Sequence, residues 1–158
     1  MNASTRSIGL RCSNPCRVAV VAGLLFATWV ATRATVAAQQ PSRSVWDGVY
    51  STEQANRGSA LYTRRCASCH GPELGGADVA PPLAGGAFLS NWDGTTLGDL
   101  SERIRTSMPI DDPGTLSRQQ VSDVLAFVLG ASSFPAGTSD LPREAELLKQ
   151  IRFEATKH

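Results

Sequence analysis

Two cysteines and a histidine lie within five residues of each other, in the run Cys66-Ala67-Ser68-Cys69-His70. On a helical turn, positions i and i+3 face the same way, so both thiols can reach the two vinyl groups on one edge of a porphyrin. His70, one turn beyond Cys66, can present an imidazole nitrogen to the iron as the proximal ligand. The spacing Cys-x-x-Cys-His therefore predicts a covalent c-type haem attachment site.

The cysteine pair also fits a structural disulfide, a thioredoxin-like redox pair or part of a zinc site. Zinc needs a fourth ligand, and beyond residue 38 there is no third cysteine and only one other histidine, His158. A thioredoxin-like motif should follow a strand in a βαβ pattern, and no such pattern is visible. The haem site is favoured over all three alternatives.

Residues 1–38 have the layout of a secretory signal peptide. Three arginines precede an apolar run over residues 18–32, and Val36-Ala37-Ala38 offers small residues for cleavage. Because the run is shorter than the about 20 residues that a spanning helix needs, we expect cleavage and a periplasmic protein. An uncleaved membrane anchor is the alternative.

Removal of the leader would make the chain acidic. All 14 acidic residues but only 11 of the 15 Lys and Arg residues follow residue 38, which leaves a net charge of −3. No basic stripe for nucleic acid remains. A mild acidic balance is typical of a solvated surface, and it can also steer a cationic partner.

The chain after residue 38 has helical patterns and no strand pattern. Residues 39–50 read as an extended lead-in with Trp46 as an apolar contact. Predicted helices begin at a capping box of Ser51 and Gln54, at Thr96, at a second box of Ser117 and Gln120, and at Pro142. The second helix should end near Ser107, before Pro109, and the third at a Gly130 C-cap. Glycine and proline pairs predict a loop over residues 71–86.

Met108 lies where the second helix stops, and it is the only methionine after the leader. Its thioether would raise the potential of a haem relative to two histidine ligands, and would fill the position where oxygen otherwise binds. Gap filling in the core is the alternative role, which most methionines have. His158 is a weaker candidate, because terminal residues fray. We therefore predict His70 and Met108 as the metal ligands, and electron transfer rather than oxygen chemistry.

These features together resemble a class I c-type cytochrome of the monohaem, bacterial periplasmic kind, over roughly residues 52–131. The motifs that carry the resemblance are, in order, Cys66-Ala67-Ser68-Cys69-His70-Gly71, Pro81-Pro82-Leu83-Ala84-Gly85, Ser107-Met108-Pro109 and Val124-Leu125-Ala126-Phe127-Val128-Leu129. The resemblance implies a small all-α fold of three to five helices around one covalently bound haem c. It divides the chain into a leader (1–38), a lead-in (39–50), a haem domain (51–131) and a C-terminal strap with a short helix (132–158).

The resemblance also implies roles for single residues. The carbonyl of Pro81 would accept the second ring N–H of His70 and so fix its tautomer. Gly58 and Tyr62 on the first helix would cross against Phe127 on the last. Trp92 would donate its ring N–H to a buried haem propionate, or would only pack in the core.

The implied function is a periplasmic one-electron carrier that turns over no substrate. Its partners would be a dehydrogenase, a terminal oxidase or another cytochrome, with a docking surface at the Gly75-Gly76 loop and the flank of Met108. Membrane association would arise only from an uncleaved leader. The alternatives are a haem enzyme with an open distal site, and the haem subunit of a dehydrogenase complex such as a quinoprotein alcohol or sugar dehydrogenase. The tail from Phe134 onward is similar to tails on cytochromes of such complexes, or is a strap over apolar surface.

Overall fold

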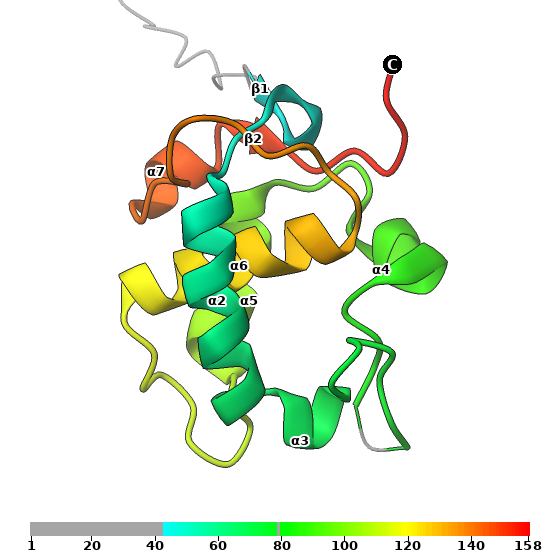
Figure 1. Ribbon diagram of the computed structural model, residues 1–158, viewed down its shortest axis with the longest axis vertical. Coiled ribbons are helices and arrows are strands. Elements are labelled where there is room, and N and C mark those ends of the chain that lie inside the picture. The colour runs from blue at the N-terminus through cyan, green and yellow to red at the C-terminus, as the bar shows by residue number, and fades with distance from the viewer. Residues whose placement is uncertain (1–42, 79) are drawn as a thin grey trace, which may run out of the picture. The chain divides into compact units, whose positions relative to one another are not determined.

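The structure is a computed structural model that describes residues 43–78 and 80–158. Its helices are α2 (Thr52–Arg65), α3 (Ala67–His70), α4 (Gly85–Trp92), α5 (Leu97–Ser107), α6 (Arg118–Ala131) and α7 (Ala145–Leu148). A 3-10 helix, η2 (Val45–Asp47), and two short strands, β1 (Arg43–Ser44) and β2 (Ile151–Arg152), complete the described part (Figure 1). The predominance of helix confirms the predicted all-α class.

The predicted leader, residues 1–38, lies outside the described residues. Within the part of the chain that is described, no helix has the length and the apolar character that a membrane crossing requires.

Helices α2 and α6 cross at the centre of the domain (Figure 1). A Cβ atom on Gly58 would lie 1.8 Å from the backbone carbonyl oxygen of Asp123, so only glycine allows the two backbones to approach this closely. One turn further along α2, the ring of Tyr62 packs against Phe127, with 5.2 Å between the ring centroids. The helix contact that the resemblance implied is therefore present.

Local capping signals placed the longer helices well. Helix α5 begins after Thr96 and ends at Ser107, as predicted, and the capping box of Ser117 and Gln120 opens α6. The predicted C-cap at Gly130 is wrong, because α6 continues to Ala131 and ends at Ser132. Gly130 instead gives room to Tyr50, whose hydroxyl would lie 3.3 Å from a Cβ at that position.

The predicted loop over residues 71–86 is too long at its end, because Gly85 and Gly86 are the first residues of α4. This helix depends on a distant segment: its Phe88 is buried, and the ring contacts the edge of Phe153 at 5.8 Å between centroids. The last helix also starts later than predicted, at Ala145 rather than near Pro142. Both errors concern short helices that tertiary packing stabilises more than local sequence does.

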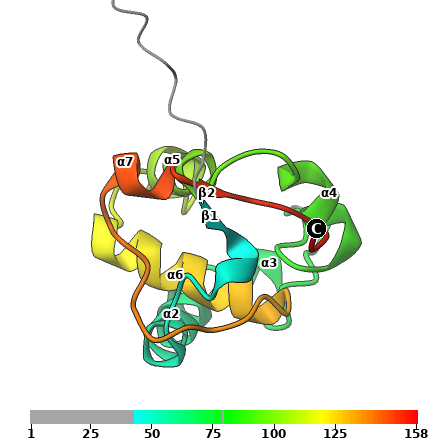
Figure 2. The ribbon, with the colours of Figure 1, turned by 90° about the horizontal axis from the view of Figure 1, so that it is seen from above.

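The prediction that the chain has no strands is also wrong, although each strand has only two residues. Strands β1 and β2 pair in parallel, with Arg43 opposite Ile151 (Figure 2). Just beyond β2, Phe153 donates its N–H to the carbonyl of Thr95 and accepts from the N–H of Gly94, both at 2.9 Å. Two residues are too few to show an alternating pattern, so the pairing between lead-in and tail left no trace in the sequence.

An aromatic cluster buries the contact between the lead-in and the tail. Trp46 packs edge-on against Phe134 at 4.8 Å between centroids, and Phe134 packs against Phe153 at 5.4 Å. The indole N–H of Trp46 donates to the carbonyl of Glu154 at 3.0 Å. The apolar contact expected at Trp46 is thus made with the tail, residues 132–158.

Gln54 is wholly buried and holds the tail on α2 and α6. Ser51 caps α2 by accepting the backbone N–H of Gln54, but the side chain of Gln54 does not complete the predicted box. Its Oε1 accepts the N–H of Leu141 at 2.6 Å, while its Nε2 donates to the carbonyl of Leu141 at 3.2 Å and to Ser122 at 3.0 Å. The amide therefore pairs with both backbone groups of one residue of the tail, as a residue of a neighbouring antiparallel strand would.

Replacement of Gln54 by leucine should lower the free energy of unfolding by about 1–3 kcal/mol, because the buried N–H of Leu141 would lose its partner and the C=O of Leu141 would keep only the Ser122 hydroxyl. Urea denaturation followed by circular dichroism measures this change. Gln119→Leu is the control, since Gln119 is exposed and bonds only the Asp123 side chain. Equal losses of unfolding free energy in the two variants would show that the buried bonds of Gln54 contribute no more to stability than the exposed bond of Gln119.

Candidate functional site

The two cysteines lie at the junction of α2 and α3 (Figure 1). Cys66 ends α2 and precedes α3, and its carbonyl accepts the backbone N–H groups of Cys69 at 3.1 Å and His70 at 2.9 Å. The three residues therefore share one helical turn. Both thiols are free and half-buried, so the structure contains no disulfide between them.

Burial raises the pKa of the Cys66 thiol; the nearby Arg65 guanidinium opposes this, and Cys69 adds to it. The thiol is consequently protonated at neutral pH. A protonated, half-buried thiol is less prone to unwanted oxidation than an exposed thiolate.

His70 is buried, with 7% of its surface exposed, and its ring is oriented by Pro81. Its Nδ1 lies 2.9 Å from the Pro81 carbonyl oxygen. A carbonyl can only accept, so this contact selects the tautomer with the proton on Nδ1 and leaves the lone pair of Nε2 for a metal. The backbone carbonyl of His70 also accepts the N–H of Gly76 at 2.9 Å. Ring and backbone are thus both held by the loop that follows.

The other two predicted site residues lie at the ends of separate helices. Met108 is the C-cap of α5; it is half-buried, and its N–H donates to the carbonyl of Ile104 at 2.9 Å. Trp92 is the last residue of α4 and packs, half-buried, against the core. The structure therefore brings His70 and Pro81 into contact and places Met108 and Trp92 on other elements.

Tyr62 makes a contact at the site that sequence reasoning missed. Its hydroxyl donates to the carbonyl of Gly71, the residue after His70, at 2.6 Å. Burial, with a smaller contribution from Cys66, raises the pKa of Tyr62 to about 12, so the hydroxyl remains a donor throughout the physiological range. The sequence could have suggested such a contact, because a tyrosine that is predicted to be buried generally needs a hydrogen-bond partner for its hydroxyl.

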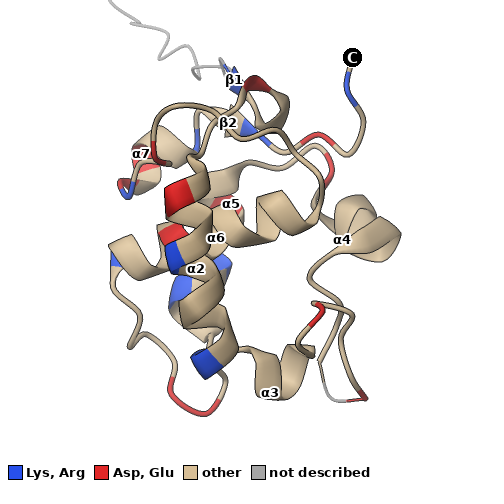
Figure 3. Ribbon diagram, viewed as in Figure 1, with Lys and Arg blue, Asp and Glu red and all other residues tan. Residues whose placement is uncertain are grey.

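Acidic residues lie on the loop that follows α3 and on the loop between α5 and α6, below the end of α2 in the view of Figure 3. Glu73 and Asp78 belong to the loop that follows α3, and Asp111 and Asp112 to the loop that follows Met108; all four are exposed. Arg65 lies 3.6 Å from Asp112 and ties the second loop to the end of α2. The surface near the motif therefore carries more negative than positive charge on these loops.

The residues present fit a covalently attached haem. Two free thiols share one helical turn, and next to them stands a buried histidine whose Nδ1 is already bonded. Within the described ranges, no group of three or more His, Cys, Asp or Glu side chains is arranged to hold a metal ion directly.

Comparison with known proteins gives one family and one solved structure. Residues 53–128 match the family described as cytochrome C oxidase, cbb3-type, subunit III. The chain is also similar to the crystal structure of the sulfane dehydrogenase SoxCD from Paracoccus pantotrophus, with 25% sequence identity and a TM-score of 0.46. That match covers 68% of this chain and 61%, less than two thirds, of the other. No curated protein matches the chain.

Proposed function

Because residues 53–128 form a cytochrome c electron-transfer domain, we propose that this protein is a periplasmic one-electron carrier with one covalently bound haem c and His/Met axial ligation. The family implies the covalent haem, and its domains are typically carriers rather than catalysts. The observation that carries the finer proposal is the contact between His70 and Pro81 beside two free thiols.

Each site residue has a separate task in this proposal. Bound haem supplies an iron that alternates between the ferrous and ferric states. Cys66 and Cys69 would hold the group by thioethers, and His70 would bind the iron through Nε2. Met108, at the end of α5, would fill the sixth position, so that little rearranges when the electron moves. Trp92 is assigned to a propionate.

The docking surface is proposed at the Gly75-Gly76 loop and the flank of Met108. Redox encounters use small interfaces, and the exposed acidic residues of these two loops would steer a cationic patch on a dehydrogenase, a terminal oxidase or another cytochrome. Nucleic acid is not proposed as a partner, since no basic stripe follows the leader. Residues 1–38 are proposed as the export signal.

The tail favours a free carrier over a fixed subunit of a dehydrogenase complex. Most of its large apolar side chains are buried within the chain, as Phe134, Leu148 and Phe153 are, and Leu147 is 46% exposed. The buried side chains of the tail cover the domain's own surface and are not offered to a catalytic partner. Gel filtration of the native periplasmic protein tests this, since a stable complex would elute well above the mass of one chain.

Replacement of Met108 by alanine tests the ligation. We expect the reduction potential to fall by a sizeable fraction of the about 0.8 V range that axial ligands span, because the thioether favours the ferrous iron. The oxidised protein should lose its methionine-to-iron charge-transfer band, and the reduced protein should bind carbon monoxide. Potentiometric titration and absorption spectroscopy measure these changes.

Ile110→Ala is the matched control, because Ile110 lies in the same loop and is 76% exposed. This variant should retain the potential, the band and the closed iron. An unchanged potential in Met108→Ala, or a native protein that already lacks the band and binds carbon monoxide, would contradict the closed His/Met site.

A further inference from the structure

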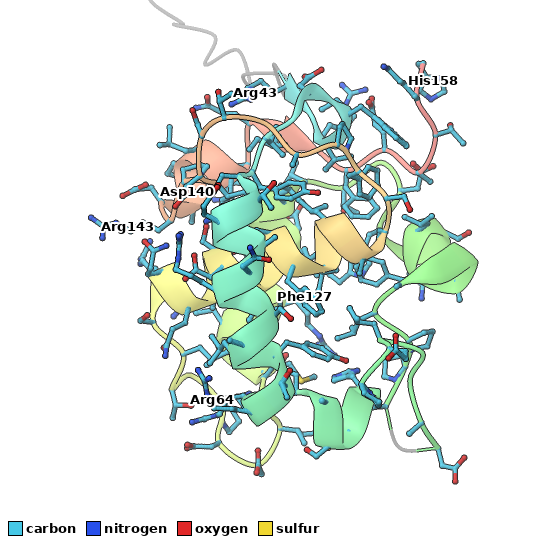
Figure 4. The ribbon with its side chains drawn as sticks, in the orientation of Figure 1. Arg43, Arg64, Phe127, Asp140, Arg143 and His158 are labelled. Atoms are coloured by element: carbon cyan, nitrogen blue, oxygen red, sulfur yellow. The ribbon has the colours of Figure 1, made fainter. Side chains whose placement is uncertain are left out.

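The phenol of Tyr62 joins the crossing of α2 and α6 to the residue after His70. The side chain is 1% exposed, and its ring packs on Phe127, labelled in Figure 4. The hydroxyl reaches past the end of α2 to the carbonyl of Gly71, at 2.6 Å. One side chain thus contacts both the helix crossing and the motif.

Gly71 is the point from which the loop leaves α3. Its φ of +78° belongs to the left-handed region, and its N–H donates to the carbonyl of Ala67 at 3.0 Å. Apart from the phenol, its carbonyl accepts only a longer bond, from the N–H of Leu74 at 3.3 Å, among the described residues. The Tyr62 hydroxyl is therefore the short bond that holds this carbonyl.

Helix α3 cannot hold its own orientation. It has four residues, and a single helical turn is unfavourable without tertiary contacts. Pro81 orients the imidazole of His70 from the far end of the loop, and Leu74 and Leu83 of the same loop pack in the core. The N–H of Cys66 joins the start of α3 to the carbonyl of Tyr62 at 2.8 Å, and the Tyr62 hydroxyl adds a second bond, from the helix crossing to the residue where the loop begins.

We propose that Tyr62 is a positioning residue for His70: its hydroxyl holds the Gly71 carbonyl and so fixes α3 and the loop that orients the imidazole towards the iron. This rests on the proposed function for the identity of the metal group. The hydroxyl acts through the backbone, because its bond is to the Gly71 carbonyl.

The chain contains a matched control. It has two tyrosines, and the hydroxyl of the other, Tyr50, donates to the carbonyl of Phe134 at 2.7 Å. Tyr50 is also buried, and burial raises its pKa as well. Its bond, however, joins the lead-in to the tail. Tyr62→Phe and Tyr50→Phe therefore each remove one phenol-to-carbonyl bond of a buried ring and keep the ring, but only the first lies beside the motif.

The test measures two properties of the holoprotein in both variants. The first is amide hydrogen exchange at Gly76, whose N–H donates to the carbonyl of His70. Tyr62→Phe should speed this exchange roughly two- to tenfold, the range that corresponds to one net hydrogen bond, whereas Tyr50→Phe should leave it at the wild-type rate. The second is the reduction potential, which should shift in Tyr62→Phe and not in Tyr50→Phe.

Equal changes in the two variants would assign the phenol to general stability, and no change in Tyr62→Phe would overturn the proposal. If Tyr62→Phe does not accumulate, uniform fluorotyrosine labelling replaces it. The labelled phenols are stronger donors, so exchange at Gly76 should slow, and an unchanged rate would overturn the proposal. Pyridine haemochrome analysis separates the two proposals: protein without haem defeats the proposed function, while exchange at Gly76 still reports on the phenol.

Discussion

Gly58→Ala should lower the free energy of unfolding by about 3 kcal/mol or more, because it forces α2 and α6 apart. The added Cβ would lie 1.8 Å from the carbonyl oxygen of Asp123 and 2.5 Å from its carbonyl carbon. Both are backbone atoms, so relief requires movement of a whole helix. Helix propensity alone predicts the opposite sign, since alanine is about 1 kcal/mol more favourable than glycine in a helix. The sign of the change therefore decides which effect wins, and urea denaturation measures it.

Gly86→Ala is the control for this prediction. Gly86 lies in α4, and a Cβ there would have no neighbour within 4 Å. Because the added methyl group would meet no neighbour, only the higher helix propensity of alanine should act. The variant should therefore be as stable as the wild type or more stable by up to about 1 kcal/mol. Stabilisation in Gly58→Ala as well would refute the close crossing. The crossing also matters to the site, since α6 carries Phe127, on which Tyr62 packs.

The double variant Cys66→Ser, Cys69→Ser should lose all covalently held haem. Each thioether forms when a thiol adds across a vinyl double bond, with sulfur bonded to one carbon and hydrogen to the other, and a serine hydroxyl does not perform this addition under the same conditions. The measurement is extraction with acidified acetone, which removes haem held only by coordination. Wild-type protein should keep its pigment in the pellet, and the single variants should keep it through one bond.

Ser68→Ala controls for disturbance of the motif, because Ser68 stands between the two cysteines and is exposed. It should retain haem as the wild type does. Wild-type protein that is colourless after export, or that releases its pigment into the acid solvent, would contradict the covalent site. Tyr62 would then not position a haem ligand, but its hydroxyl would still hold the Gly71 carbonyl.

Features that depend on residues close together in the chain were predictable. The predicted haem motif occupies five consecutive residues that share one helical turn, and the cap at Thr96 and the box at Ser117 each involve side chains within three residues of the backbone groups they bind. Such interactions form within one helical turn, so they can be recognised from the residue types and their spacing before the tertiary structure is known. The contact of His70 with Pro81 spans a loop, and only the resemblance to a family suggested it.

The contacts between residues far apart in the chain were decided by the tertiary structure. The side chain of Gln54 does not form the expected capping box, and binds instead the buried N–H and C=O of Leu141, which the fold brings beside it. Gly130 does not end α6 but lies inside it, beside the ring of Tyr50. The pairing of β1 with β2 and the bond from Tyr62 to Gly71 likewise join separate elements. The sequence alone thus determined the reactive motif and the long helices, through short-range bonds. The fold decided how the motif is held, because burial compels polar groups to find partners wherever the chain brings them.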